Sequence, residues 1–199
     1  ALVLASSSLL AAEQTRAVKP FSTIRTQGAL SVEVVVGDAH SIIVKGDDKY
    51  MEKIITDIAG DELLISYKDM KSIRLSDDLK VIVTMPNLSK FKMEGAGLTT
   101  VSKINGDRFE LSYEGVGLLK VSGKVNHFKL RAQGIGFVDA KGLQAESVDA
   151  VVEGIGSVEV TATDKLKANV QGIGSLTYFG NPKSVSKVAD GIGGINAGK

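Results

Sequence analysis

The chain has 199 residues, of which 43% are hydrophobic and 24% charged, and its formal net charge is +1. This length and composition are typical of one globular domain with a sizeable core, and they exclude an intrinsically disordered chain. The near-zero net charge argues against a nucleic-acid-binding protein. The absence of cysteine excludes disulfides, cysteine-based metal sites and thiol catalysis.

The first twelve residues, ALVLASSSLLAA, are apolar and small. A run of this length is too short to span a bilayer, and it is similar to the hydrophobic part of a secretory signal whose basic start is missing. The alternative is a short buried helix or strand. We interpret residues 1–19 as a signal-peptide remnant and leader. We therefore expect an exported protein, located in the periplasm, on the outer cell surface or in the medium.

Residues 20–88 alternate between apolar and polar side chains, which is typical of β-strands. The alternating runs end at turn-forming pairs such as Gly37-Asp38 and Gly60-Asp61, and Asp47 to Glu52 is expected to form a short helical turn. No linker separates this segment from residue 89. We therefore expect it to be a strand-rich opening that caps the rest of one single domain, residues 20–199.

Residues 89–199 contain a tandem repeat marked by a Gly-x-Gly tripeptide. The six tripeptides start 18 to 20 residues apart, at Gly95, Gly115, Gly134, Gly154, Gly172 and Gly191. Apolar residues recur two and four positions before the first glycine, between the glycines, and four and six positions after it. We expect all five columns to face the core. The column between the glycines consists of Ala96, Val116, Ile135, Ile155, Ile173 and Ile192.

This pattern predicts an all-β protein, a single-stranded, right-handed parallel β-helix or β-solenoid with coils of about 19 residues. Each coil is expected to hold two short strands that bend at Gly-x-Gly, with a second turn near Asn105-Gly106, Gly123, Gly142 and Gly180. One coil cannot bury its apolar face alone, so coils must stack, with each column above itself.

A charged column five residues before each first glycine supports this stacking. Its members alternate in sign along the repeat: Lys90, Glu110, Lys129, Asp149 and Lys167. In a stack, each side chain then has opposite charges above and below it, which favours one register over a slipped one.

The best candidate for a site is the polar column directly before each Gly-x-Gly. It consists of Glu94, Glu114, Gln133, Glu153, Gln171 and Asp190. Stacked carboxylates repel each other, so Glu94 and Glu114 are expected to share a proton, a cation or a base, and Lys92 and Arg131 lie on the same face. One hypothesis is a ladder that binds a cation or a polysaccharide. The other is a ladder that only holds the register.

Asp139 and Glu159 form a second candidate pair, in one column of adjacent coils. Two carboxylates about 5 Å apart are compatible with retaining glycoside hydrolysis, although the flanking Lys120 and Lys141 also suit a plain surface charge pair. His40 is expected to be a solvated turn residue and His127 to lie at a coil corner, too far apart to share a metal. We predict no metal site, cofactor site or catalytic residue.

The opening FSTIRTQGALSVEVVVGD, the segment LKVIVTMPNLSKFKMEGAG and the units EGVG, QGIG and EGIG resemble the head GIN domain family, described as heads of autotransporter adhesins. The resemblance covers about Phe21 to Lys199, and it implies a secreted or envelope protein with a β-helix-like stack.

We therefore expect a non-enzymatic adhesin or interaction module. Its partner is expected to be an envelope polysaccharide or another protein. Two alternatives stay open. One is a polysaccharide-active β-helix enzyme, a lyase or hydrolase, and the other is a scaffold that forms homo-oligomers through an exposed solenoid end.

Overall fold

The computed structural model describes residues 12–68 and 79–199. Most of the apolar run that we interpret as a signal remnant lies in residues 1–11, outside the described residues. In chain order the elements are β1 (Ala12–Thr15), β2 (Thr23–Ala29), β3 (Ser31–Val36), β4 (Ser41–Gly46), α1 (Asp48–Met51), β5 (Ile54–Ala59), β6 (Glu62–Tyr67), β7 (Lys80–Met85), β8 (Lys90–Tyr113), β9 (Val116–Ala132), β10 (Ile135–Val152), β11 (Ile155–Phe179), β12 (Ser184–Gly191) and β13 (Gly194–Ala197).

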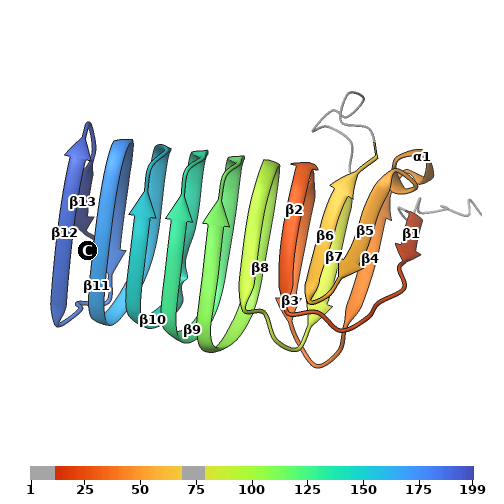
Figure 1. Ribbon diagram of the computed structural model, residues 1–199, viewed down its shortest axis with the longest axis horizontal. Coiled ribbons are helices and arrows are strands. Elements are labelled where there is room, and N and C mark those ends of the chain that lie inside the picture. Colours follow the sequence, from red (N-terminus) through yellow and green to blue (C-terminus); the bar gives the residue numbers. More distant parts are fainter. Residues whose placement is uncertain (1–11, 69–78) are drawn as a thin grey trace, which may run out of the picture.

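The repeat folds into a parallel β-solenoid, as its pattern predicts (Figure 1). Strands β8 to β12 pair in parallel, and equivalent residues of successive repeats are register partners: Gly117 pairs with Gly136, and Gly136 with Gly156. The predicted division of each coil into two short strands was wrong. Pairing continues through the second turn, which remains only as register shifts such as the one between Val101 and Ile104.

In five of the six tripeptides, both glycines lie directly on the backbone of the coil before them. A Cβ on Gly134 would overlap the carbonyl oxygen of Gly115 and would lie 2.5 Å from the Tyr113 ring. Gly117 has a φ of +130°, and a Cβ there would overlap the carbonyl of Gly97. Only glycine satisfies both the close approach and the left-handed backbone at such a bend.

The core runs along the axis of the stack, and four of the five predicted core columns enclose it. Phe91, Leu111, Leu119 and Val121 are examples, each at most 2% exposed. The Phe109 and Phe128 rings stack with centroids 5.9 Å apart. The Tyr113 hydroxyl lies 3.0 Å from the carbonyl oxygens of Gly117 and Ile135, to which it donates, and burial raises its pKa.

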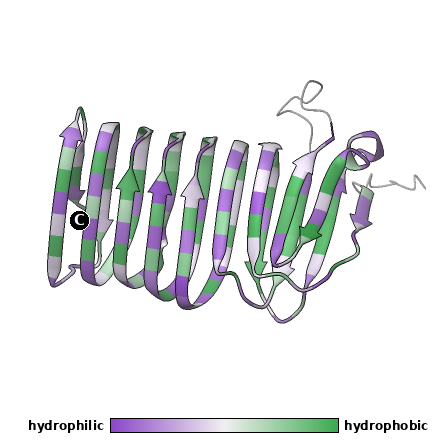
Figure 2. Cartoon of the chain, in the orientation of Figure 1, coloured by the Kyte–Doolittle hydropathy of each residue, from purple (hydrophilic) through white to green (hydrophobic). Residues whose placement is uncertain are grey.

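The prediction that the column between the glycines faces the core was wrong. Val116, Ile135, Ile155 and Ile173 are 50 to 56% exposed. Strict alternation continues through the bend, so the two glycines take the inward positions and the residue between them points outward. The hydropathy of the coils alternates along each strand for the same reason (Figure 2).

The opening segment is strand-rich and covers the first Gly-x-Gly coil, as predicted. Its β2 and β3 pair in parallel with β8, with Gly28 opposite Gly95, and therefore extend the solenoid by a coil. The later strands β6 and β7 stack in parallel on the far side of β2 and β3. Antiparallel β4 and β5, joined by α1, end the stack, and β1 pairs with β4 (Figure 1). The helical turn at Asp47 is confirmed, since its side chain accepts from the backbone N–H of Lys49.

The last coil is the least covered part of the stack. Every residue of β12 is exposed, including Ala189, which belongs to a column that is buried in earlier coils. Tyr178 and Ile195 are only partly buried. Among the described residues, no helix is both long and apolar enough to cross a membrane.

Candidate functional site

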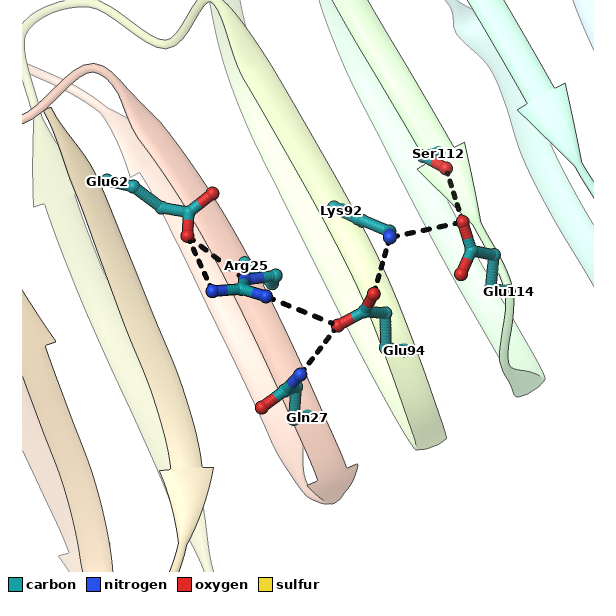
Figure 3. A network of polar contacts seen from close by, with 7 residues as sticks. All are labelled: Arg25, Gln27, Glu62, Lys92, Glu94, Ser112 and Glu114. Carbon is teal, nitrogen blue, oxygen red and sulfur yellow. Dashed lines mark hydrogen bonds and ion pairs between the residues drawn. The ribbon is translucent and has the colours of Figure 1, made fainter.

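The predicted polar ladder lies on one face, and its first half is an ion-pair network across neighbouring coils (Figure 3). The Lys92 ammonium contacts Glu94 and lies 3.2 Å from a carboxylate oxygen of Glu114. On the other side of Glu94, the Gln27 side-chain amide donates to it at 2.8 Å and Arg25 lies 4.0 Å away. Of the three groups that Glu94 and Glu114 were expected to share, a proton, a cation or a base, the structure shows a base, Lys92.

These contacts set the titration of the pair. The hydrogen bond from Lys92, followed by that from Gln27, lowers the pKa of Glu94. The hydrogen bond to Glu94 raises the pKa of Lys92, and Glu114 adds to this effect. Glu94 is therefore a carboxylate at neutral pH, held by the ammonium of Lys92.

In the middle of the ladder, Glu153 is paired with Gln133 and with Arg131. Arg131 lies 2.8 Å from a carboxylate oxygen of Glu153, and the Gln133 amide donates to the same carboxylate at 2.6 Å. Gln171 and Asp190 are register partners in the next two coils. Gln27, in the opening coil, occupies the same column as Glu94 and was missed because the second glycine of its tripeptide is replaced by Leu30.

Asp139 and Glu159 are register partners in β10 and β11, as the column assignment predicts. A carboxylate oxygen of Asp139 lies 3.7 Å from the Lys120 ammonium and another accepts from the backbone N–H of Lys141 at 3.2 Å. Asp139 thus has one cation and one backbone N–H beside it, and neither Asp139 nor Glu159 lines the groove described below.

The two histidines lie in different settings. The prediction that His40 is merely solvated was wrong, because its ring packs edge-on to Phe21 at 5.2 Å and its Nε2 lies 3.2 Å from the Phe21 carbonyl oxygen. His127 is exposed, and its Nδ1 shares a hydrogen bond of 2.7 Å with the Ser147 hydroxyl. Within residues 12–68 and 79–199, no cluster of three or more His, Asp or Glu side chains could hold a metal ion.

A groove of about 530 Å³ opens on the described surface, and the sequence analysis did not assign it as a site. We call it the basic groove. The charged and polar side chains that line it are Arg108, His127, Lys129, Ser147, Asp149, Lys165, Lys167, Ser184 and Ser186.

Two register rows build this groove. One runs Arg108, His127, Ser147, Lys165 and Ser184, and the other contains Lys129, Asp149, Lys167 and Ser186. The second row belongs to the charged column of the sequence analysis, and the predicted stacking of opposite charges is confirmed. Its Lys167 lies 3.8 Å from Asp149. Each residue of the first row stands seven positions before the first glycine of a Gly-x-Gly tripeptide. The repeat spacing could therefore have identified this row from the sequence.

The sequence from residue 20 to 182 matches the model of the family described as "Putative auto-transporter adhesin, head GIN domain". The chain belongs to this family. The resemblance inferred from the opening segment and the glycine units is therefore confirmed, and a comparison with curated proteins gives no match.

Solved structures share the fold of this family member. A putative adhesin from Bacteroides fragilis is 23% identical, with a TM-score of 0.76 over 96% of this chain and 98% of that one. A putative adhesin from Parabacteroides merdae is 17% identical, with a TM-score of 0.54 over 94% and 96%. A putative lipid binding protein from Parabacteroides distasonis is 19% identical, with a TM-score of 0.50 over 94% and 96%.

Proposed function

We propose that this protein is a non-enzymatic adhesion module of the bacterial cell envelope that binds a surface polymer across several coils. The observation that carries the proposal is the basic groove, in which side chains of successive coils repeat along the stack and present one continuous surface. The adhesin names of the family and of its solved relatives support a binding role and a location outside the cytoplasm.

Binding to immobilised envelope polysaccharides tests this proposal. The purified chain is expected to bind at least one neutral or acidic polysaccharide of a defined panel and to leave its length unchanged, as measured by size-exclusion chromatography after incubation. Failure to bind any polysaccharide of the panel would overturn the proposal.

The same panel separates two surfaces of the molecule. Lys165→Gln with Lys167→Gln alters the basic groove, whereas Glu114→Gln with Glu153→Gln alters the polar ladder. We expect the first pair to weaken binding and the second to leave it unchanged, because the ladder carboxylates already bind bases and amides of their own face. The reverse result would move the site to the ladder.

An enzyme is the second candidate, favoured by the register pairing of Asp139 with Glu159. A polysaccharide-cleaving enzyme shortens the polymer, and Asp139→Asn or Glu159→Gln removes that activity. If the wild-type chain shortens a polymer and both the Asp139→Asn and the Glu159→Gln variants fail to do so, the enzyme replaces the adhesion module as the proposed function.

A scaffold that associates through its end is the third candidate, favoured by the full exposure of β12, with Val188 55% exposed. An exposed strand edge of this kind is a template for pairing with another chain. Light scattering of the purified chain measures this directly. A mass that rises with concentration, and that falls when Val188→Lys is introduced, supports end-to-end pairing, whereas a constant monomer mass rejects it.

A further inference from the structure

We infer that the basic groove binds a linear, anionic polysaccharide laid along the solenoid axis. The inference rests on the proposed binding function and adds the chemical class of the ligand. Its premises are the charge of the groove, its hydroxyl groups and the regular spacing of its rows.

The charge of the groove differs from that of the whole chain. Four basic side chains line it, Arg108, Lys129, Lys165 and Lys167, against the single carboxylate of Asp149, whereas the chain as a whole has a formal net charge of only +1. The Lys167 side chain is 72% exposed, so its ammonium remains available to a ligand although it lies 3.8 Å from Asp149. A surface of this kind attracts anions and opposes cations.

The spacing of the cations matches an extended polymer better than a compact ligand. Strands of one sheet lie about 4.8 Å apart, so Lys129 and Lys167, two coils apart, are separated by about 10 Å along the axis. Arg108 and Lys165 are three coils apart in the neighbouring row. Anionic groups spaced along one chain contact such cations in turn.

The polar groups beside the cations favour a hydroxyl-rich chain. Ser147, Ser184 and Ser186 offer hydroxyls that both donate and accept hydrogen bonds, and the bond to Ser147 holds the exposed His127 ring in place. Phe128, the aromatic ring of the lining, is 2% exposed and is therefore not free to stack on a sugar. Recognition then depends on charge and hydrogen bonds, and it weakens as salt screens the charges.

Equilibrium binding of the full chain to three probes tests the inference: a polyuronate with carboxylates, a teichoic-acid-type polymer with phosphodiesters, and a neutral glucan of equal length. We expect one or both acidic polymers to bind at least about tenfold more tightly than the glucan, with affinity falling as salt rises. The stronger acidic arm identifies the anion. Preference for the glucan would overturn this inference but leave the adhesion proposal standing, whereas no binding to any envelope polymer would overturn both.

Three variants keep the result specific to the groove. Lys165→Gln with Lys167→Gln is expected to reduce affinity for the acidic polymer about tenfold or more, whereas Lys120→Gln with Lys124→Gln removes the same charge outside the groove lining and should have little effect. Asp149→Asn should raise the affinity, which a merely structural role would not produce. Equal loss in both lysine pairs, or equally tight binding of duplex DNA, would show unspecific attraction of polyanions and would overturn the inference.

Discussion

At the scale of single residues, the inward glycines of Gly-x-Gly impose the tightest requirement in the molecule. Their places are core positions by alternation, yet in five of the six tripeptides the backbone of the preceding coil occupies the space that a side chain would need. The apolar residue between them is free of this requirement. This explains why glycine, rather than any apolar residue, recurs at the bend.

Gly117→Ala should destabilise the fold by at least about 2 kcal/mol, because Ala adopts the left-handed backbone poorly and its Cβ overlaps the carbonyl of Gly97. Gly106→Ala is the matched control in the same repeat, since nothing lies within 4 Å of a Cβ there. It should change the free energy of unfolding by less than about 0.5 kcal/mol in denaturant titrations. Equal effects of the two variants would contradict this role of the bend glycines.

The Lys92–Glu94 pair predicts a pH dependence of stability. The folded-state pKa of Glu94 is lowered, so its contribution is present above the ordinary value of 4.5 and is lost as the pH falls through the folded value. Because the pair is accessible to solvent, it contributes no more than about 1 kcal/mol. The difference in unfolding free energy between wild type and Glu94→Gln should therefore shrink from pH 7 to pH 3. A difference that stays constant would show that the charge of Glu94 does not stabilise the fold.

At the scale of elements, alternation within a strand decides which apolar residues belong to the core. The column of Val116, Ile135 and Ile155 is as apolar as the column of Leu119 and Val138, yet only the second is buried. The composition of a column does not separate the two. Strict alternation of inward and outward residues, counted from the buried Tyr113 through the bend, would have done so.

Ile135→Thr and Leu119→Ala measure this contrast. Ile135 is 52% exposed, and threonine keeps its β-branched shape, so we expect a cost below about 1 kcal/mol. Leu119 is fully buried, and its truncation should cost about 2 to 5 kcal/mol. Comparable losses in chemical denaturation would mean that the outward row packs against something in solution.

The sequence was informative about the coils because equivalent residues of successive repeats lie above one another. It was less informative about the opening segment. Gly28 is the register partner of Gly95, but Leu30 stands where the second glycine of a Gly-x-Gly tripeptide would be. In addition, β6 and β7 stack on β2 and β3, so that β7 lies between β3 and β4, which are consecutive in the chain. Long-range order of this kind has no local signal. The register of the charged column was predictable from the alternating signs of Glu110, Lys129 and Asp149. The basic groove that this column lines was not predictable, because its depth depends on the shape of the assembled face.

At the scale of the whole molecule, a solenoid converts a repeat of about 19 residues into rows that run along its axis. Each outward column becomes one such row, and a row of like chemistry can contact a polymer over several coils. The polar ladder compensates its own charges through Lys92 and Arg131, while the basic groove retains a surplus of cations. This difference is why we place ligand binding at the groove.

The most direct test of this account is the affinity of the full chain for anionic oligosaccharides of increasing length, with their size checked after incubation. From Arg108 to Ser184 the row covers four coil steps, about 19 Å at the usual strand spacing. We predict that affinity rises with length until the oligosaccharide spans this distance, then levels off, and that the oligosaccharides remain intact. Affinity that does not depend on length, or oligosaccharides that are shortened, would contradict an adhesion module that binds along its coils.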